Sequence, residues 1–130
     1  MTIKWNYEQS YVKISIPEYV KNILHKFQQQ SLAKPQHAPY RFTAPIFFQS
    51  IQQTIPIENS DKMDKNGKTQ VQQVVVSSLF YSHAVDDTIP PGLNTISTSQ
   101  AISTERTNED ITQLLDYLST HPDAVICYYA

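Results

Sequence analysis

Residues 3–27, IKWNYEQSYVKISIPEYVKNILHKF, decide the fold of this chain. Two β-prone runs, Thr2–Trp5 and Tyr11–Ser15, flank the polar segment 6–10. This pattern predicts a β-hairpin whose loop is longer than two residues. The hairpin then leads directly into a segment with helical spacing, so the chain begins as a strand pair joined to a helix.

The predicted helix after the hairpin has its own start signals. Ser15 and Glu18 have the spacing of a capping box, and Pro17 suits a first helical turn. The apolar residues that fall on one helical face are Ile16, Val20, Ile23, Leu24 and Phe27. The basic side carries Lys21, His25 and Lys26. Two interpretations of that side stay open, a solvated helix face or a surface that meets phosphate.

From Gln28 to Thr69 no helical or strand period is sustained, and four prolines recur. We expect residues 30–69 to form a long irregular connector, which is unusual inside a compact domain. The aromatic residues of this segment are Tyr40, Phe42, Phe47 and Phe48. Since aromatic side chains in a free linker would be exposed, they indicate a segment that packs against other parts of a larger protein.

The next ordered segment has two possible structures. Val71, Val74, Val75, Ser78 and Leu79 have the spacing of a buried helical stripe, which predicts a helix as far as Tyr81. The three consecutive valines 74–76 instead favour a strand, and both alternatives for 71–80 stay open. Residues 90–92, Pro-Pro-Gly, are expected to stop any helix that reaches them.

The last third predicts a helix followed by a strand. Thr107 and Asp110 have N-cap spacing. The apolar residues that follow at helical spacing are Ile111, Leu114, Leu115 and Leu118. The helix is expected to end within residues 119–123, and 124–129 have the composition of a strand, whose visible partner is the N-terminal hairpin.

These elements together predict an α+β fold with an N-terminal hairpin, about three helices, the connector and a C-terminal strand. We divide the chain into 1–29, 30–69 and 70–130 and interpret the whole as a single incomplete domain. The only cysteine, Cys127, excludes an internal disulfide and a cysteine-built zinc site. With no signal-peptide or membrane-span pattern, we expect an intracellular protein, cytoplasmic or nuclear, and no membrane partner.

Charge is unevenly distributed along the sequence. Residues 1–45 carry six basic and two acidic residues, a net +4, whereas the remainder carries four basic and ten acidic residues, a net −6. Any anionic partner is therefore expected to meet the N-terminal third. The total of −2 argues against strong nonspecific binding to nucleic acid.

Several segments resemble, in order, one region of the polymerase polyprotein of copia-type LTR retrotransposons. They are IKWNYEQSYVKISIPEYVKNILHKFQ, KPQHAP, SLFYSHAVD, LNTIS and TQLLDYLSTHPDAVICYYA. The resemblance implies the end of the reverse transcriptase palm, the thumb and the connection. Residues 3–15 would be the palm hairpin that helps to hold the primer end, and 15–29 would begin the thumb. Residues 107–129 would lead toward ribonuclease H.

The sequence Ala84-Val85-Asp86-Asp87 differs by one residue from the YVDD box of reverse transcriptases. In the family that box lies before the segment resembling residues 3–15, so the resemblance implies that this match is a coincidence. A two-metal box also needs a tight hairpin turn between apolar strands, whereas Thr-Ile-Pro-Pro-Gly follows here. We therefore expect a polar helix end or loop, and interpret the nearby His83 as a surface residue.

The resulting expectation is a non-catalytic fragment with no cofactor, no metal, no small-molecule substrate and no catalytic residue of its own. Its partners would be an RNA/DNA primer-template duplex and the rest of the parent polyprotein. The predicted phosphate contacts are Lys4, Lys13, Lys21 and Lys26. Trp5 and Tyr7 are predicted packing or stacking groups, with Trp5 favoured as hairpin core. The alternatives are a protein-interaction module or an inert remnant.

Overall fold

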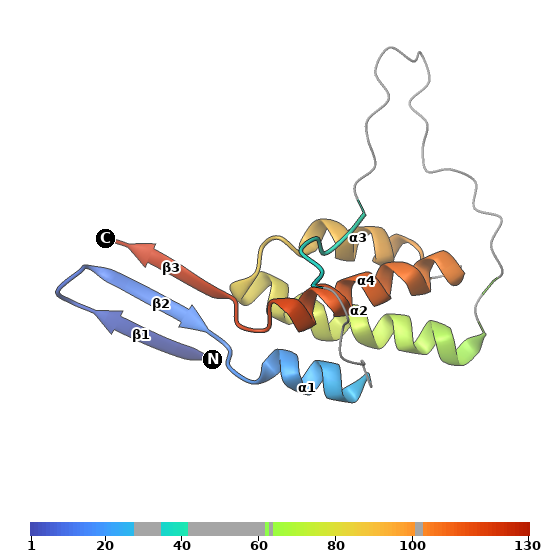
Figure 1. The fold of residues 1–130 in the computed structure, drawn as a ribbon, viewed down its shortest axis with the longest axis horizontal. Helices are drawn as coiled ribbons and strands as arrows, with labels where there is room; N and C mark the ends of the chain where they lie inside the picture. The colour runs from blue at the N-terminus through green and yellow to red at the C-terminus, as the bar shows by residue number, and fades with distance from the viewer. Residues whose placement is uncertain (28–34, 42–61, 63, 101–102) are drawn as a thin grey trace, which may run out of the picture.

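The computed structural model describes residues 1–27, 35–41, 62, 64–100 and 103–130. Within them, four helices pack together and a three-stranded antiparallel sheet projects from one end (Figure 1). The elements are β1 (Thr2–Asn6), β2 (Tyr11–Ser15), α1 (Tyr19–Lys26), α2 (Lys65–Val85), α3 (Pro90–Thr98), α4 (Glu105–Thr120) and β3 (Val125–Tyr129). The predicted α+β class is confirmed. None of the described helices has the length and apolar character needed to cross a membrane.

The sheet brings the two ends of the chain together. β2 lies in the centre, and both β1 and β3 pair with it in antiparallel orientation. In this register Trp5 is opposite Val12 and Val12 is opposite Tyr128. Because residues directly opposite one another share a face, the register decides which side chains can act together.

The entry into α1 differs from the prediction. Ser15 is the last residue of β2, paired with both Thr2 and Val125, so it does not cap the helix. Glu18 occupies the N-cap position with φ 65° and without a side-chain capping hydrogen bond, and Pro17 lies before the helix. The capping-box prediction was wrong because sheet pairing holds Ser15. The apolar face was right: Ile16, Val20 and Ile23 are buried, and Leu24 and Phe27 pack against the core.

α2 settles the choice between helix and strand for residues 71–80. It begins at Lys65, earlier than expected, where the Asp64 side chain accepts a hydrogen bond from Gly67 N–H at 2.7 Å. The predicted stripe is buried except for Leu79, which is 44% exposed. The buried side continues instead through Tyr81, Ser82 and Val85. The helical period therefore prevails over the strand preference of the valines.

The prolines at 90 and 91 begin a helix, which corrects the expectation that they stop one. They occupy the first turn of α3, where a helix needs no backbone N–H donor. α4 also starts earlier than predicted, with Thr104 rather than Thr107 at the N-cap. The Thr107 hydroxyl accepts a hydrogen bond from Thr104 N–H at 3.3 Å. The predicted stripe of Ile111, Leu114, Leu115 and Leu118 is buried.

Part of the expected connector, residues 35–41, lies along α4. Gln36 N–H donates to Thr120 Oγ1 at 2.9 Å, and the Arg41 guanidinium forms a 2.6 Å ion pair with Glu109. Tyr40 packs where Gly92 has no side chain: a Cβ there would lie 3.1 Å from Tyr40 Cβ. The aromatic residues Phe42, Phe47 and Phe48 lie outside the described residues.

Tyr81 fixes the sheet to the helices. Its side chain is 1% exposed and its ring stacks on that of Tyr19 with centroids 5.8 Å apart. The Tyr81 hydroxyl accepts a hydrogen bond from Ala124 N–H at 3.0 Å and donates to Pro122 O at 3.4 Å. It therefore holds the segment between α4 and β3, directly before the strand begins.

Replacing Tyr81 with Phe should lower the free energy of unfolding by about 1–3 kcal/mol, since two partly buried backbone groups lose their partner. Burial raises the pKa of the Tyr81 phenol. The contribution of the Tyr81 hydroxyl to the free energy of unfolding should therefore be complete below the ordinary tyrosine pKa of about 10. It should be lost as the pH rises beyond that value. Urea unfolding followed by circular dichroism at neutral and alkaline pH measures both effects. Tyr7→Phe, at an 85% exposed side chain, is the control; equal stability of both variants would contradict the role of Tyr81.

Candidate nucleic-acid interface

One face of the sheet is apolar and continues the core. Ile14 and Ile126 pack against the helices at its inner end. Farther out, Trp5 is 65% and Tyr128 is 59% exposed, because the sheet reaches beyond the helices (Figure 1). Trp5 is therefore not the hairpin core residue that we expected. Its ring stacks on Tyr7, with centroids 6.3 Å apart and 13° between planes.

The opposite face carries lysine and tyrosine side chains. Lys4 lies directly opposite Lys13, which in turn lies opposite Cys127. Two residues along each strand, and so on the same face, Tyr11 is opposite Tyr129, with ring centroids 6.0 Å apart in an edge arrangement. Lys13 Nζ lies 5.1 Å from the centroid of the Tyr11 ring. We call this set, Lys4, Tyr11, Lys13, Cys127 and Tyr129, the lysine face.

The electrostatics of the lysine face are one-sided. Like charges directly opposite each other in a sheet destabilise it. The three strands contain no acidic residue that could offset Lys4 and Lys13, and Glu8 lies in the turn between β1 and β2. Because both lysines are exposed, an anion can approach both ammonium groups. This arrangement can bind a phosphate group.

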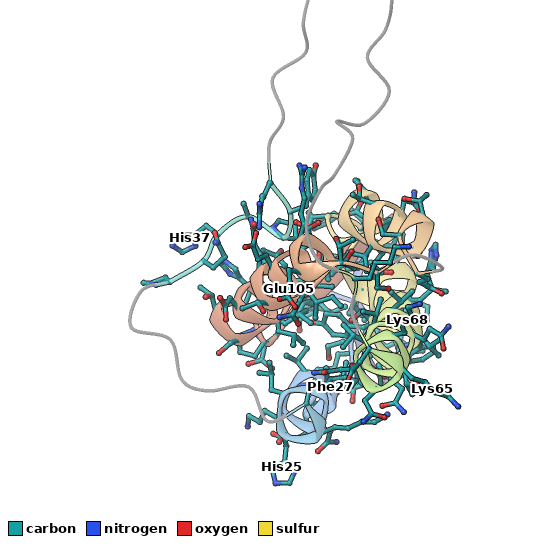
Figure 2. All side chains as sticks on the ribbon, turned by 90° about the vertical axis from the view of Figure 1, so that its right-hand side faces the viewer. His25, Phe27, His37, Lys65, Lys68 and Glu105 are labelled. Atoms are coloured by element: carbon teal, nitrogen blue, oxygen red, sulfur yellow. The ribbon has the colours of Figure 1, made fainter. Side chains whose placement is uncertain are left out.

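Lys21 and Lys26 lie on α1, apart from the sheet. Lys21 Nζ forms a 2.9 Å ion pair with Glu18, and this hydrogen bond raises the pKa of Lys21. Lys26 Nζ lies 5.4 Å from the centroid of the Phe27 ring. Both are exposed, as is His25, which points away from the helices in Figure 2. Their exposure fits both a solvated helix face and a surface that meets phosphate, and Lys21 is already paired with Glu18.

The six predicted contact residues thus fall into three groups. The structure brings Lys4 and Lys13 together, puts Trp5 and Tyr7 on the other face, and leaves the two α1 lysines on a separate element. Sequence reasoning missed Tyr11 and Tyr129. Alternation within 11–15 and 125–129 indicates which residues of each strand share a face, but only the pairing register shows that the two tyrosines meet.

The Asp86-Asp87 pair ends a helix, as predicted. Asp86 is 7% exposed, and its Oδ1 accepts hydrogen bonds from Thr88 N–H at 3.1 Å and Thr88 Oγ1 at 2.6 Å. Its Oδ2 accepts a hydrogen bond from the Tyr117 hydroxyl at 3.2 Å. The described residues contain no cluster of three or more metal-ligating side chains. Asp86 therefore joins the end of α2 to α4, which is a structural role.

Replacing Asp86 with Ala should lower the free energy of unfolding by about 1–3 kcal/mol, since Thr88 and Tyr117 lose their acceptor. Asp87→Ala, at an exposed position, should change it by less than about 0.5 kcal/mol. Thermal unfolding with and without millimolar Mg²⁺ tests the alternative role of the two aspartates, which is metal binding. A metal-dependent rise in Tm that either substitution abolishes would show that the pair holds metal.

Comparison with known proteins adds no relative. No protein-family model, no curated protein and no solved structure matches the chain. The resemblance to copia-type polyproteins therefore stays a prediction from the sequence segments, and the function has to be argued from the geometry of the lysine face.

Proposed function

We propose that this chain is a non-catalytic segment of a retrotransposon reverse transcriptase polyprotein, and that it binds the phosphate backbone of a primer-template duplex through the lysine face. The ordered sequence segments support the parentage. The position of Lys4 opposite Lys13 carries the proposal for binding. Polymerase and ribonuclease H chemistry would belong to other parts of the parent protein.

The lysine pair is suited to phosphate for a simple electrostatic reason. Directly opposed residues have Cα atoms about 4.5–5.5 Å apart, so one phosphate can approach both ammonium groups. Binding would then replace a repulsion between Lys4 and Lys13 with two attractions. Cys127, the residue opposite Lys13 on β3, is small and leaves room above the sheet. The Tyr11 and Tyr129 hydroxyls beside the lysine pair can donate hydrogen bonds to phosphate oxygens of the duplex next to the bound phosphate.

The same geometry favours contacts with the backbone over contacts with bases. The stacked rings of Trp5 and Tyr7 lie on the opposite face, so they cannot stack on bases of a duplex held at the lysine face. Two lysines provide few phosphate contacts, and the net charge of the chain is −2. Binding by the lysine face should therefore be weak, independent of sequence and sensitive to salt.

Lys4→Gln combined with Lys13→Gln should weaken binding to a labelled RNA–DNA primer-template. It should also reduce the slope of log K against log salt by about 1, the value for the one phosphate that the pair would share. Fluorescence anisotropy over a range of salt concentrations measures both quantities. The matched control is Lys62→Gln with Lys68→Gln, which removes the same charge outside the sheet.

The outcomes separate four possibilities. Loss of binding in the sheet variant alone supports binding at the lysine face. An equal loss in both variants would show that binding depends only on the total charge of the chain. Trp5, the only tryptophan, reports on the other face, and its emission should stay that of an exposed residue when duplex is added. If the duplex changes the Trp5 emission in the lysine variant as well, the duplex binds at the Trp5 face instead. If no duplex binds at low salt, the chain is better described as an inert remnant.

A further inference from the structure

The outer face of α2 carries an apolar patch. Val76 is 70%, Phe80 is 54% and Leu79 is 44% exposed. Together with His83 and Ala84 they line a shallow groove. The Phe80 ring is held beside Tyr19 with centroids 5.6 Å apart, so it stays at the surface instead of folding inward. Surface helices normally present polar residues on the side away from the core, so this patch indicates a contact with another chain.

Opposite charges mark the two ends of the same helix face. Lys65, Val76 and His83 are separated by 11 and 7 residues, close to whole numbers of helical turns, so they lie on one side of α2. Lys65 points away from the bundle at the start of α2 (Figure 2). Asp87 is exposed just beyond the end of the helix. An exposed lysine therefore lies at the start of this helix, and an exposed aspartate lies just beyond its end, with the apolar patch between them.

We propose that this face is a homodimer interface in which two α2 helices pack antiparallel about a two-fold axis at Val76. Lys65 begins α2, and Asp87 lies in the turn just after the helix ends, so an axis at Val76 brings the Lys65 end of each copy toward the Asp87 end of the other. A two-fold axis makes both ion pairs at once. Parallel packing would instead oppose lysine to lysine and aspartate to aspartate.

The same axis arranges the middle of the contact. On the N-terminal side of Val76 lie Gln72 and Gln73, which would meet Phe80 and Leu79 on the C-terminal side of the other copy. The glutamine stems can cover the apolar rings while their amides stay at the rim. The helix macrodipoles also lie antiparallel in this arrangement. Because the exposed residues of this α2 face are not part of the lysine face, this inference does not depend on the proposed function.

Sedimentation velocity of the full chain over a wide concentration range tests the proposal. We expect a shift from the 14.9 kDa monomer to twice that mass as the concentration rises. Val76→Asp, which places two carboxylates at the axis, should abolish the shift while the circular dichroism spectrum stays unchanged. Ile3→Asp makes the same kind of change at a 53% exposed residue of β1 and should leave the shift intact.

A charge exchange tests the antiparallel geometry. Lys65→Glu and Asp87→Lys should each weaken self-association by about three- to tenfold. Combining both substitutions in one chain, or mixing the two single variants, should restore it, because each restores opposite charges at both ends.

A monomer at every concentration would overturn the homodimer. A dimer that persists in Val76→Asp, or that is lost in Ile3→Asp, would place the contact elsewhere. Single charge variants that associate as well as the unaltered chain would contradict the antiparallel arrangement.

Discussion

The hydroxyl of Tyr81 holds together two parts of the chain that are far apart in sequence. It accepts the N–H of Ala124 from inside the helix bundle and thereby sets where β3 begins. The start of β3 sets its register with β2, so that Lys13 lies opposite Cys127 and Tyr11 opposite Tyr129. The lysine face therefore depends on a buried phenol in α2. A change at Tyr81 would alter the surface of the sheet without touching any of its residues.

Repeated apolar spacing predicted what lies in the core, whereas single-residue end signals did not predict where elements begin. The stripes through Val20 and Ile23 and through Leu114 and Leu118 are buried as expected, since several residues agree on one face. The spacing of Ser15 and Glu18 predicts a helix cap, but strand pairing on both sides holds the Ser15 backbone. Pro90 predicts a helix stop, although a first helical turn accepts proline equally well. Such local signals fit more than one structure, and tertiary contacts decide between them.

The candidate site was predictable in its charge and not in its geometry. The basic N-terminal third indicated Lys4 and Lys13, and the structure makes them direct neighbours. Alternation within the predicted strand 2–5 puts Lys4 and Trp5 on opposite faces, but only the pairing register shows that Lys4 lies opposite Lys13. The exposed patch on α2 is likewise not predictable from the sequence: Leu79 fits the spacing of a buried stripe, and only the packed helices show that it is exposed. Both proposed associations therefore use surfaces whose geometry comes from the structure, the lysine face and the α2 face.

The most direct test of this account uses the only cysteine. In a Lys13→Cys variant the new thiol would lie directly opposite Cys127 on the lysine face, at a separation that a disulfide can span. Mild oxidation followed by mass spectrometry should show an intramolecular disulfide in the monomer, and Val12→Cys, which faces the other side of the sheet, should not form one. A disulfide in the Val12 variant but not in the Lys13 variant, or in neither, would contradict the register on which the lysine face depends.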